Sequence, residues 1–158
     1  MSDRPWYESE PIPALMRQAR GSYGDAARRA LADAGCDDIP QNGGFVLAAL
    51  EPAEGEPEFI SQAAAVAPLR LSKQRASQLI DTLVLRGYLE RRIDPDDRRR
   101  MGIRLTDRGR AAAVAIQAAV EAIDADLKQR LTVVELHGLR AGLAALAEIR
   151  EQADDVSD

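Results

Sequence analysis

The chain has 158 residues, of which 46% are apolar but only 4% aromatic, so it can form one domain with a core built mainly from Ala, Leu, Val and Ile. The absence of an apolar run of about 18 residues excludes a transmembrane helix, and the single cysteine, Cys36, excludes an internal disulfide. No signal-peptide pattern is visible, and we expect a cytoplasmic location.

The net charge of −5 is unevenly distributed along the chain. The segment from Arg70 to Arg110 carries 12 basic and 6 acidic residues, whereas the rest carries 9 basic and 20 acidic residues. A basic segment in an acidic body is typical of a local phosphate-binding face. From charge alone, a solvated charged surface explains the pattern equally well.

The first half of the chain predicts two helices. A long helix should begin near Pro11–Pro13, because proline is tolerated in a first turn, and should end at Gly35. A short helix is expected over Gly44–Leu50, and the polar, proline-containing stretch Glu51–Glu58 reads as a loop.

The next segment predicts two helices joined by a tight turn, which is the helix-turn-helix arrangement. The first helix is expected over Ile60–Val66 and the turn contains Pro68. Ser72 is suited to cap the second helix, which should run to Arg86 and end at Gly87. The apolar stripe of this second helix is Ala76, Leu79, Ile80 and Leu83.

After Gly87 the apolar residues alternate, which favours strands over Tyr88–Ile93 and Met101–Thr106. The stretch between them, Asp94–Arg100, contains a proline and several aspartates and reads as the tip of a hairpin.

Two long helices are predicted to finish the chain. The first runs over Asp107–Leu131, and a capping box at Thr132 and Glu135 begins the second. The apolar stripe of the last helix has spacings of three and four residues, close to a coiled-coil seam: Leu136, Leu139, Leu143 and Leu146.

This order of elements predicts a mainly α fold with a small β-hairpin wing, a winged helix-turn-helix with N- and C-terminal dimerisation helices. The DNA-binding domain is expected over residues 39–110 and the dimerisation region over residues 1–38 and 111–158. A symmetric homodimer is favoured over a monomer, because the flanking helices have apolar stripes that a small central core cannot cover. The predicted dimerisation residues are Ile12, Leu15, Met16, Leu136, Leu139, Leu143 and Leu146.

The start of the second helix of the helix-turn-helix is the candidate DNA-reading surface. Arg can bind guanine bidentately, Gln can read adenine, and Ser and Lys can reach bases or phosphates. An ordinary polar helix face is the alternative, but no acidic residue occurs between Arg70 and Ile80. The predicted DNA-binding residues are Ser72, Lys73, Gln74, Arg75, Ser77 and Gln78, together with Arg98, Arg99 and Arg100 at the wing tip.

The run from Leu83 to Gly109 resembles the wing of the MarR (multiple antibiotic resistance regulator) family. The shared pattern is a leucine, a glycine that ends the recognition helix, an arginine, then Asp-x-Arg and Leu-Thr-x-x-Gly. It is met here by Leu83, Gly87, Arg91, Asp97-Arg98-Arg99 and Leu105-Thr106-Asp107-Arg108-Gly109. The helix-turn-helix turn departs from the pattern, with Ala67-Pro68 where a glycine is common.

The resemblance implies an obligate dimer that reads a near-palindromic operator, with Arg99 in the minor groove and Asp97 as its clamp. The predicted function is a double-stranded-DNA-binding transcriptional regulator, a repressor released by a small-molecule ligand. The alternative is a winged-helix protein-interaction module that does not bind DNA. An enzyme is not expected, because no nucleophile–base pair or phosphate loop is present.

Other residues give weaker signals. Cys36 follows a helix end and precedes two aspartates, which disfavours the thiolate and therefore redox sensing. His137 is the single histidine, and no metal-ligand spacing or cofactor motif is present. Trp6, Tyr7 and Tyr23 fit ordinary packing better than an effector pocket.

Overall fold

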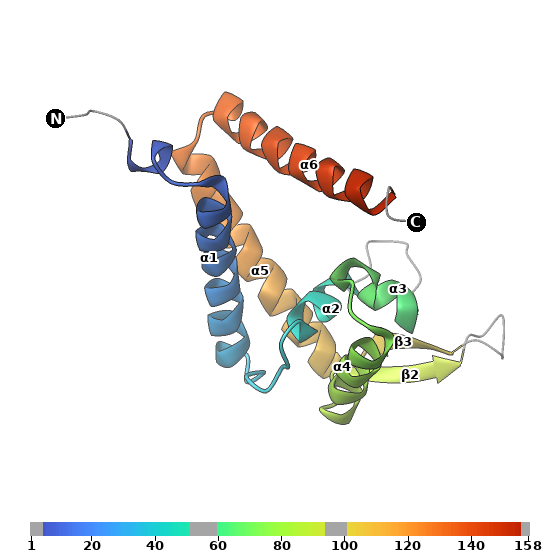
Figure 1. The fold of residues 1–158 in the computed structure, drawn as a ribbon. Coiled ribbons are helices and arrows are strands. Elements are labelled where there is room, and N and C mark those ends of the chain that lie inside the picture. Colours follow the sequence, from blue (N-terminus) through green and yellow to red (C-terminus); the bar gives the residue numbers. More distant parts are fainter. Residues whose placement is uncertain (1–4, 51–59, 94–100, 156–158) are drawn as a thin grey trace. The chain divides into compact units, whose positions relative to one another are not determined.

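A computed structural model describes residues 5–50, 60–93 and 101–155 (Figure 1). The chain divides into two compact units, Met1–Val120 and Glu121–Asp158. The elements, in chain order, are η1 (Trp6–Glu8), α1 (Ile12–Asp33), α2 (Gly43–Ala49), β1 (Ile60–Ser61), α3 (Gln62–Val66), η2 (Ala67–Leu69), α4 (Lys73–Leu85), β2 (Leu89–Ile93), β3 (Met101–Leu105), α5 (Asp107–Arg130) and α6 (Val133–Asp155). The predicted fold class, mainly α with a small sheet, is confirmed.

Glycines end two helices of the first unit where the sequence predicts. Gly35 follows α1 with a φ of +68°, and Gly87 follows α4 with a φ of +75°, a conformation that suits glycine. After α1, the amide of Cys36 donates to the carbonyl of Leu31 at 2.8 Å, and after α4 the amide of Tyr88 donates to Leu83 at 2.9 Å. Both ends are therefore Schellman motifs.

Serine side chains begin the two helices of the helix-turn-helix. The Ser61 hydroxyl accepts from the Ala64 amide at 3.1 Å at the start of α3. The Ser72 hydroxyl accepts from the Arg75 amide at 3.3 Å at the start of α4. Each hydroxyl satisfies a backbone donor that has no partner within the helix. Ser72 therefore caps α4, as the sequence predicts.

The sheet has three strands in the order β1-β3-β2, all antiparallel. The hairpin of β2 and β3 confirms the predicted wing, but the prediction that Ile60 opens a helix is wrong. Ile60 pairs with Ile103 instead, and Ser61 with Gly102. This pairing uses the backbone groups on the outer edge of β3, and α3 begins only after the cap at Ser61.

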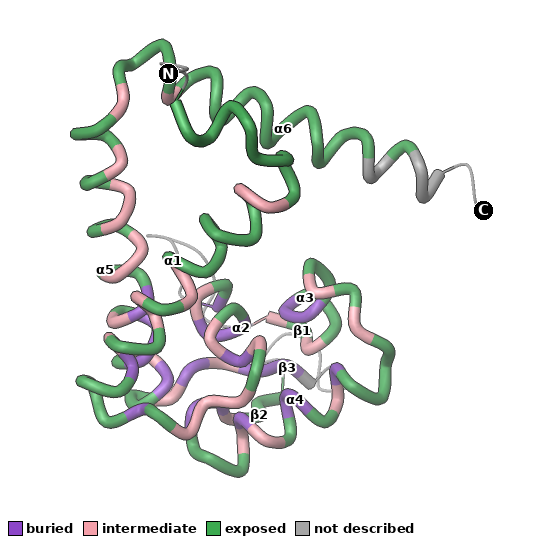
Figure 2. The backbone as a smooth tube through the Cα atoms, turned by 60° about the vertical axis from the view of Figure 1, so that its left-hand side comes forward, coloured by how far each residue is buried: buried purple, intermediate pink, exposed green. Residues whose placement is uncertain are grey.

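The core of the first unit lies between the sheet and α2, α4 and the first half of α5. The purple segments of Figure 2 gather around these elements. The fully buried side chains with the largest volumes are Tyr88, Leu47, Ile80, Leu83, Leu89, Ile103 and Val46. Leu31 at the end of α1 and Ile116 on α5 join this core.

The second unit consists of the end of α5 and α6. The predicted capping box opens α6: the Glu135 amide donates to the Thr132 hydroxyl at 3.3 Å, and the Thr132 amide donates to the Glu135 carboxylate at 2.8 Å. The Thr132 hydroxyl also donates to this carboxylate at 2.7 Å, and this bond, followed by the bond from the Thr132 amide, lowers the pKa of Glu135. Most of α6 is exposed in the single chain (Figure 2).

Candidate DNA interface

The first two turns of α4 present the predicted DNA-binding side chains on one surface. Their positions alternate with the buried stripe that contains Leu79, Ile80 and Leu83, so the helix has one inward and one outward face. The outward residues Ser72, Lys73, Gln74, Arg75 and Gln78 are exposed, and Ser77 is half-buried. The structure thus leaves this surface accessible to a partner.

The stretch of chain that leads into α4 and forms its first two turns carries no negative side chain. The sequence contains no acidic residue between Ile60 and Ile80. The next acid, Asp81, forms an ion pair with Arg91 of β2. The charge of Asp81 is therefore directed to the base of the wing.

A hollow of about 430 Å³ lies between α3, η2 and α4. Its walls are largely apolar, formed by small side chains such as Ala63, Ala67 and Ala76. Its polar lining residues are Gln62, Arg70, Lys73 and Ser77. Two of the predicted DNA-binding residues therefore line a concavity that the sequence did not reveal.

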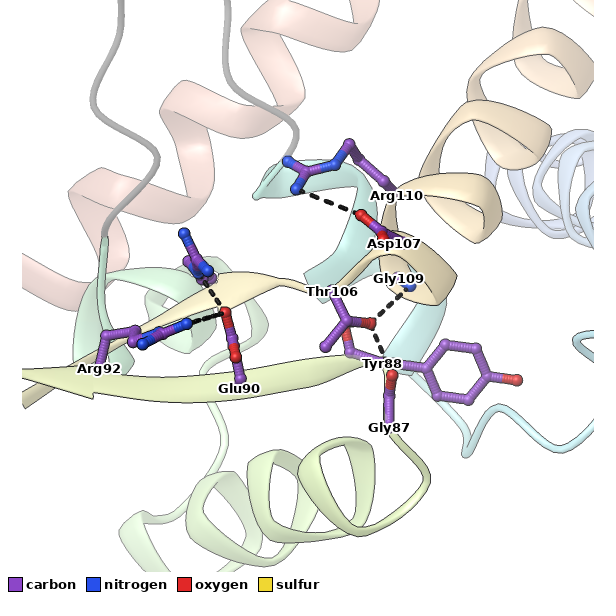
Figure 3. Close-up of polar contacts among 9 residues, drawn as sticks. Gly87, Tyr88, Glu90, Arg92, Thr106, Asp107, Gly109 and Arg110 are labelled. Carbon is purple, nitrogen blue, oxygen red and sulfur yellow. Dashed lines mark hydrogen bonds and ion pairs between the residues drawn. The ribbon is translucent and has the colours of Figure 1, made fainter.

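At the base of the wing, Glu90 of β2 lies between two arginines (Figure 3). Arg104 of β3 donates to its carboxylate, and Arg92 donates to the same oxygen at 3.2 Å. The hydrogen bond from Arg104, and then that from Arg92, lower the pKa of Glu90. The predicted wing-tip residues Asp97, Arg98, Arg99 and Arg100 lie outside the described residues.

Thr106 and Gly109 join the end of α4 to the start of α5 (Figure 3). The Thr106 hydroxyl donates to the Gly87 carbonyl at 2.6 Å and accepts from the Gly109 amide at 3.0 Å, so it caps α5. The Thr106 amide donates to the Tyr88 carbonyl at 3.1 Å. A Cβ at position 109 would lie 2.0 Å from that carbonyl oxygen, which only glycine permits. The Thr-x-x-Gly part of the pattern is thus explained by these contacts of Thr106 and Gly109 with Gly87 and Tyr88, which we call the lock at Thr106.

A second link, between Tyr88, Asp38 and Arg108, escaped the sequence prediction. The Tyr88 hydroxyl donates to the Asp38 carboxylate, and Arg108 donates to it at 3.0 Å. Arg108 also donates to the Arg86 carbonyl at 2.7 Å and lies 4.3 Å from the Tyr88 ring centroid. Burial, and then the bond to Asp38, raise the pKa of Tyr88. The cluster ties the loop after α1 to the end of α4.

Asp38→Asn should destabilise the protein more at pH 7 than at pH 2.5. The hydrogen bond from Tyr88, and then the charge of Arg108, lower the pKa of Asp38 below its ordinary 3.8. The carboxylate therefore stabilises the fold above that ordinary value, and this contribution is lost as the pH falls through the folded pKa. Urea unfolding at the two pH values measures the difference.

The exposed neighbour Asp37 offers the matched control. Asp37→Asn should unfold like the unsubstituted protein at both pH values. An Asp38→Asn effect of equal size at pH 7 and pH 2.5 would assign the loss to packing and not to the carboxylate charge.

The predicted dimerisation residues are incompletely covered in the single chain. Ile12 and Met16 on α1 are 62% and 43% exposed, and Leu15 is half-buried. On α6, Leu139, Leu143 and Leu146 are 41%, 47% and 39% exposed, and Leu136 is half-buried. Trp6 and Tyr7, in edge-to-face contact, are also exposed.

Two further predictions concern Cys36 and the membrane. Cys36 is buried, and its thiol lies 3.5 Å from the Ala34 carbonyl. In the ranges 5–50, 60–93 and 101–155, no helix combines the length and apolarity that crossing a membrane requires.

Residues 44–100 match the model of the MarR family. The S. aureus MepR–DNA complex has a TM-score of 0.69 and 21% identity, over 89% of this chain and 98% of MepR. The repressor CouR bound to a 23-mer DNA duplex has a TM-score of 0.64 and 22% identity, over 93% and 99% of the two chains. S. aureus MepR bound to ethidium bromide has a TM-score of 0.58 and 20% identity, over 89% and 97%. No curated protein matches by sequence.

Proposed function

We propose, from the match of residues 44–100 to the model of the MarR family, that the protein is a sequence-specific, double-stranded-DNA-binding transcriptional regulator. The observation that carries the proposal is the start of α4. Lys73, Gln74 and Arg75 are exposed together in a stretch without acids, which suits entry into the major groove. MepR and CouR, which share the fold, are seen in complexes with DNA.

The protein acts as a homodimer on a near-palindromic operator in the cytoplasm. The apolar stripe of α6, with Leu139, Leu143 and Leu146 each more than a third exposed, supports a second copy as the partner. Two copies related by a twofold axis would present two α4 helices to two half-sites.

Release of a repressor by a small molecule is the regulatory part of the proposal. MepR, which has the same fold, is seen with ethidium bromide bound. This likeness supports a small-molecule ligand for this chain, to which the proposal assigns the role of effector. The family match likewise favours a regulator over an enzyme.

Duplex binding at two salt concentrations tests the proposal. The probes are a random-sequence duplex and the DNA upstream of the protein's own gene. Affinity should fall steeply between 50 and 200 mM salt, because each phosphate contact releases condensed counterions (about 10³–10⁵-fold for 6–10 contacts). Flat or absent binding on both probes would support the protein-interaction alternative.

Arg99→Ala should weaken binding and lower the salt slope by about one unit per protomer. The resemblance places Arg99 in the minor groove, where the negative potential favours arginine. Arg29→Gln, at an exposed position of α1, removes the same charge far along the sequence from the wing and should leave the slope unchanged. Equal slopes for Arg99→Ala and the unsubstituted protein would remove Arg99 from this role.

A further inference from the structure

Arg70 has an unfavourable backbone conformation for its residue type. It closes the turn between η2 and α4 with a φ of +48° and a ψ of +40°, in the left-handed region. Among the described residues, the other non-glycine residue with positive φ is Asn42. In this region the Cβ of any L residue crowds a carbonyl oxygen; the short side chain of asparagine offsets this cost by local hydrogen bonds, whereas the long side chain of arginine does not.

The fold requires this conformation from whichever residue occupies the position. The Arg70 amide donates to the Ala67 carbonyl at 3.1 Å, which closes the 3-10 turn of η2. Leu69 and Leu71 on either side are half-buried and pack against the core. The backbone is therefore held from both sides, and glycine or asparagine would adopt it at lower cost than arginine.

The side chain of Arg70 lies beside the start of α4, which is where the proposed DNA-binding residues are. Its exposed side chain lines the same hollow as Lys73 and Ser77 of α4. It thus adds a basic side chain of the preceding turn to the polar residues at the start of α4, within a stretch of sequence, Ile60–Ile80, that contains no acid. An arginine beside a recognition helix can bind a backbone phosphate bidentately.

We propose that Arg70 is an additional DNA-contacting residue, which binds a backbone phosphate next to the major groove that α4 enters. The proposal rests on the proposed DNA-binding function and adds a contact on the turn, before the cap Ser72. Phosphate contacts fix the register of a protein on the duplex without reading bases. Arg70 would therefore strengthen binding to all sequences alike.

Two substitutions at Arg70 separate charge from backbone geometry. Arg70→Asn suits the left-handed conformation but removes the charge, and Arg70→Lys keeps the charge on a similar backbone. Binding of a random-sequence duplex is measured from 50 to 200 mM salt, and the thermal midpoint of unfolding is measured for each variant. Arg29→Gln again controls for the loss of one positive charge.

Arg70→Asn should bind more weakly at 50 mM salt and lower the salt slope by about one unit per protomer. Its thermal midpoint reports any change in the stability of the fold, and asparagine keeps the left-handed backbone accessible. Arg70→Lys should keep most of the slope, and Arg29→Gln all of it.

Failure of this proposal differs from failure of the proposed function. If the unsubstituted protein binds DNA and Arg70→Asn shows the same affinity and slope, Arg70 makes no phosphate contact. If Arg70→Asn lowers the thermal midpoint and leaves the slope unchanged, its role is structural and the proposal is overturned. If the unsubstituted protein binds no duplex, the DNA-binding function itself is wrong.

Discussion

Gly109→Ala should destabilise the protein by about 3 kcal/mol, at the upper end of what overpacking usually costs. The new Cβ would lie 2.0 Å from the carbonyl oxygen of Tyr88 and 3.1 Å from a methyl group of Leu105. The oxygen has little freedom to move, because it accepts from the Thr106 amide at 3.1 Å. Urea unfolding measures the loss as a lower midpoint at an unchanged slope.

Gly21 in α1 provides the matched control. A Cβ built there meets no atom within 4 Å, so Gly21→Ala adds a methyl group without a clash. Because alanine favours a helix more than glycine does, this variant should be as stable as the unsubstituted protein or up to about 1 kcal/mol more stable. A Gly109→Ala protein that unfolds at the same midpoint as Gly21→Ala would mean that the approach of α5 to Tyr88 is looser than the structure shows.

Leu143→Arg should convert the proposed dimer into a monomer and lower DNA affinity by about a hundredfold or more. Leu143 lies in the apolar stripe of α6 and is 47% exposed in the single chain. A buried, unpaired guanidinium in a dimer interface carries a large desolvation cost. Loss of the dimer removes the second half-site contact, whose effective concentration contributes a factor of about 10²–10⁴. Sedimentation at micromolar concentration measures the first effect, and duplex binding the second.

Glu148→Arg introduces the same side chain on the opposite side of α6. Glu148 lies nine positions after Leu139, which is two and a half helical turns, so its exposed side chain points away from the stripe. This control should remain dimeric and bind DNA as the unsubstituted protein does. A dimeric Leu143→Arg protein would show that the α6 stripe is not the interface.

The sequence was most informative where one residue type satisfies a local backbone requirement. Gly35 and Gly87 end helices because they adopt positive φ, and Ser72 begins α4 because its hydroxyl accepts an amide hydrogen. These effects act over three or four residues, so the residue type alone predicts them. The Leu-Thr-x-x-Gly pattern was also visible, but its physical cause was not, because Gly109 is constrained by a carbonyl 21 positions earlier in the chain.

Contacts between distant segments could not be predicted in this way. The hydrogen bond between Tyr88 and Asp38 joins residues 50 positions apart, and neither has a neighbour pattern that marks it. The strand β1 has only two residues, too few for alternation to distinguish it from the start of a helix. The hollow beside α4 is formed by alanines of separate elements, whose sequence reads simply as helix-forming. The wing tip, whose three arginines contribute to the basic charge of the predicted DNA-binding segment, lies outside the described residues.

The composition of the lock at Thr106 bears on how this scaffold could be re-engineered. The lock consists of main-chain carbonyls, one hydroxyl and a position without a side chain, and no outward residue of α4 takes part in it. Lys73, Gln74 and Arg75 can therefore be exchanged as a set while the frame that orients them stays intact. Libraries varied at these positions would sample new base preferences on one backbone, with foldability and specificity as separable design variables.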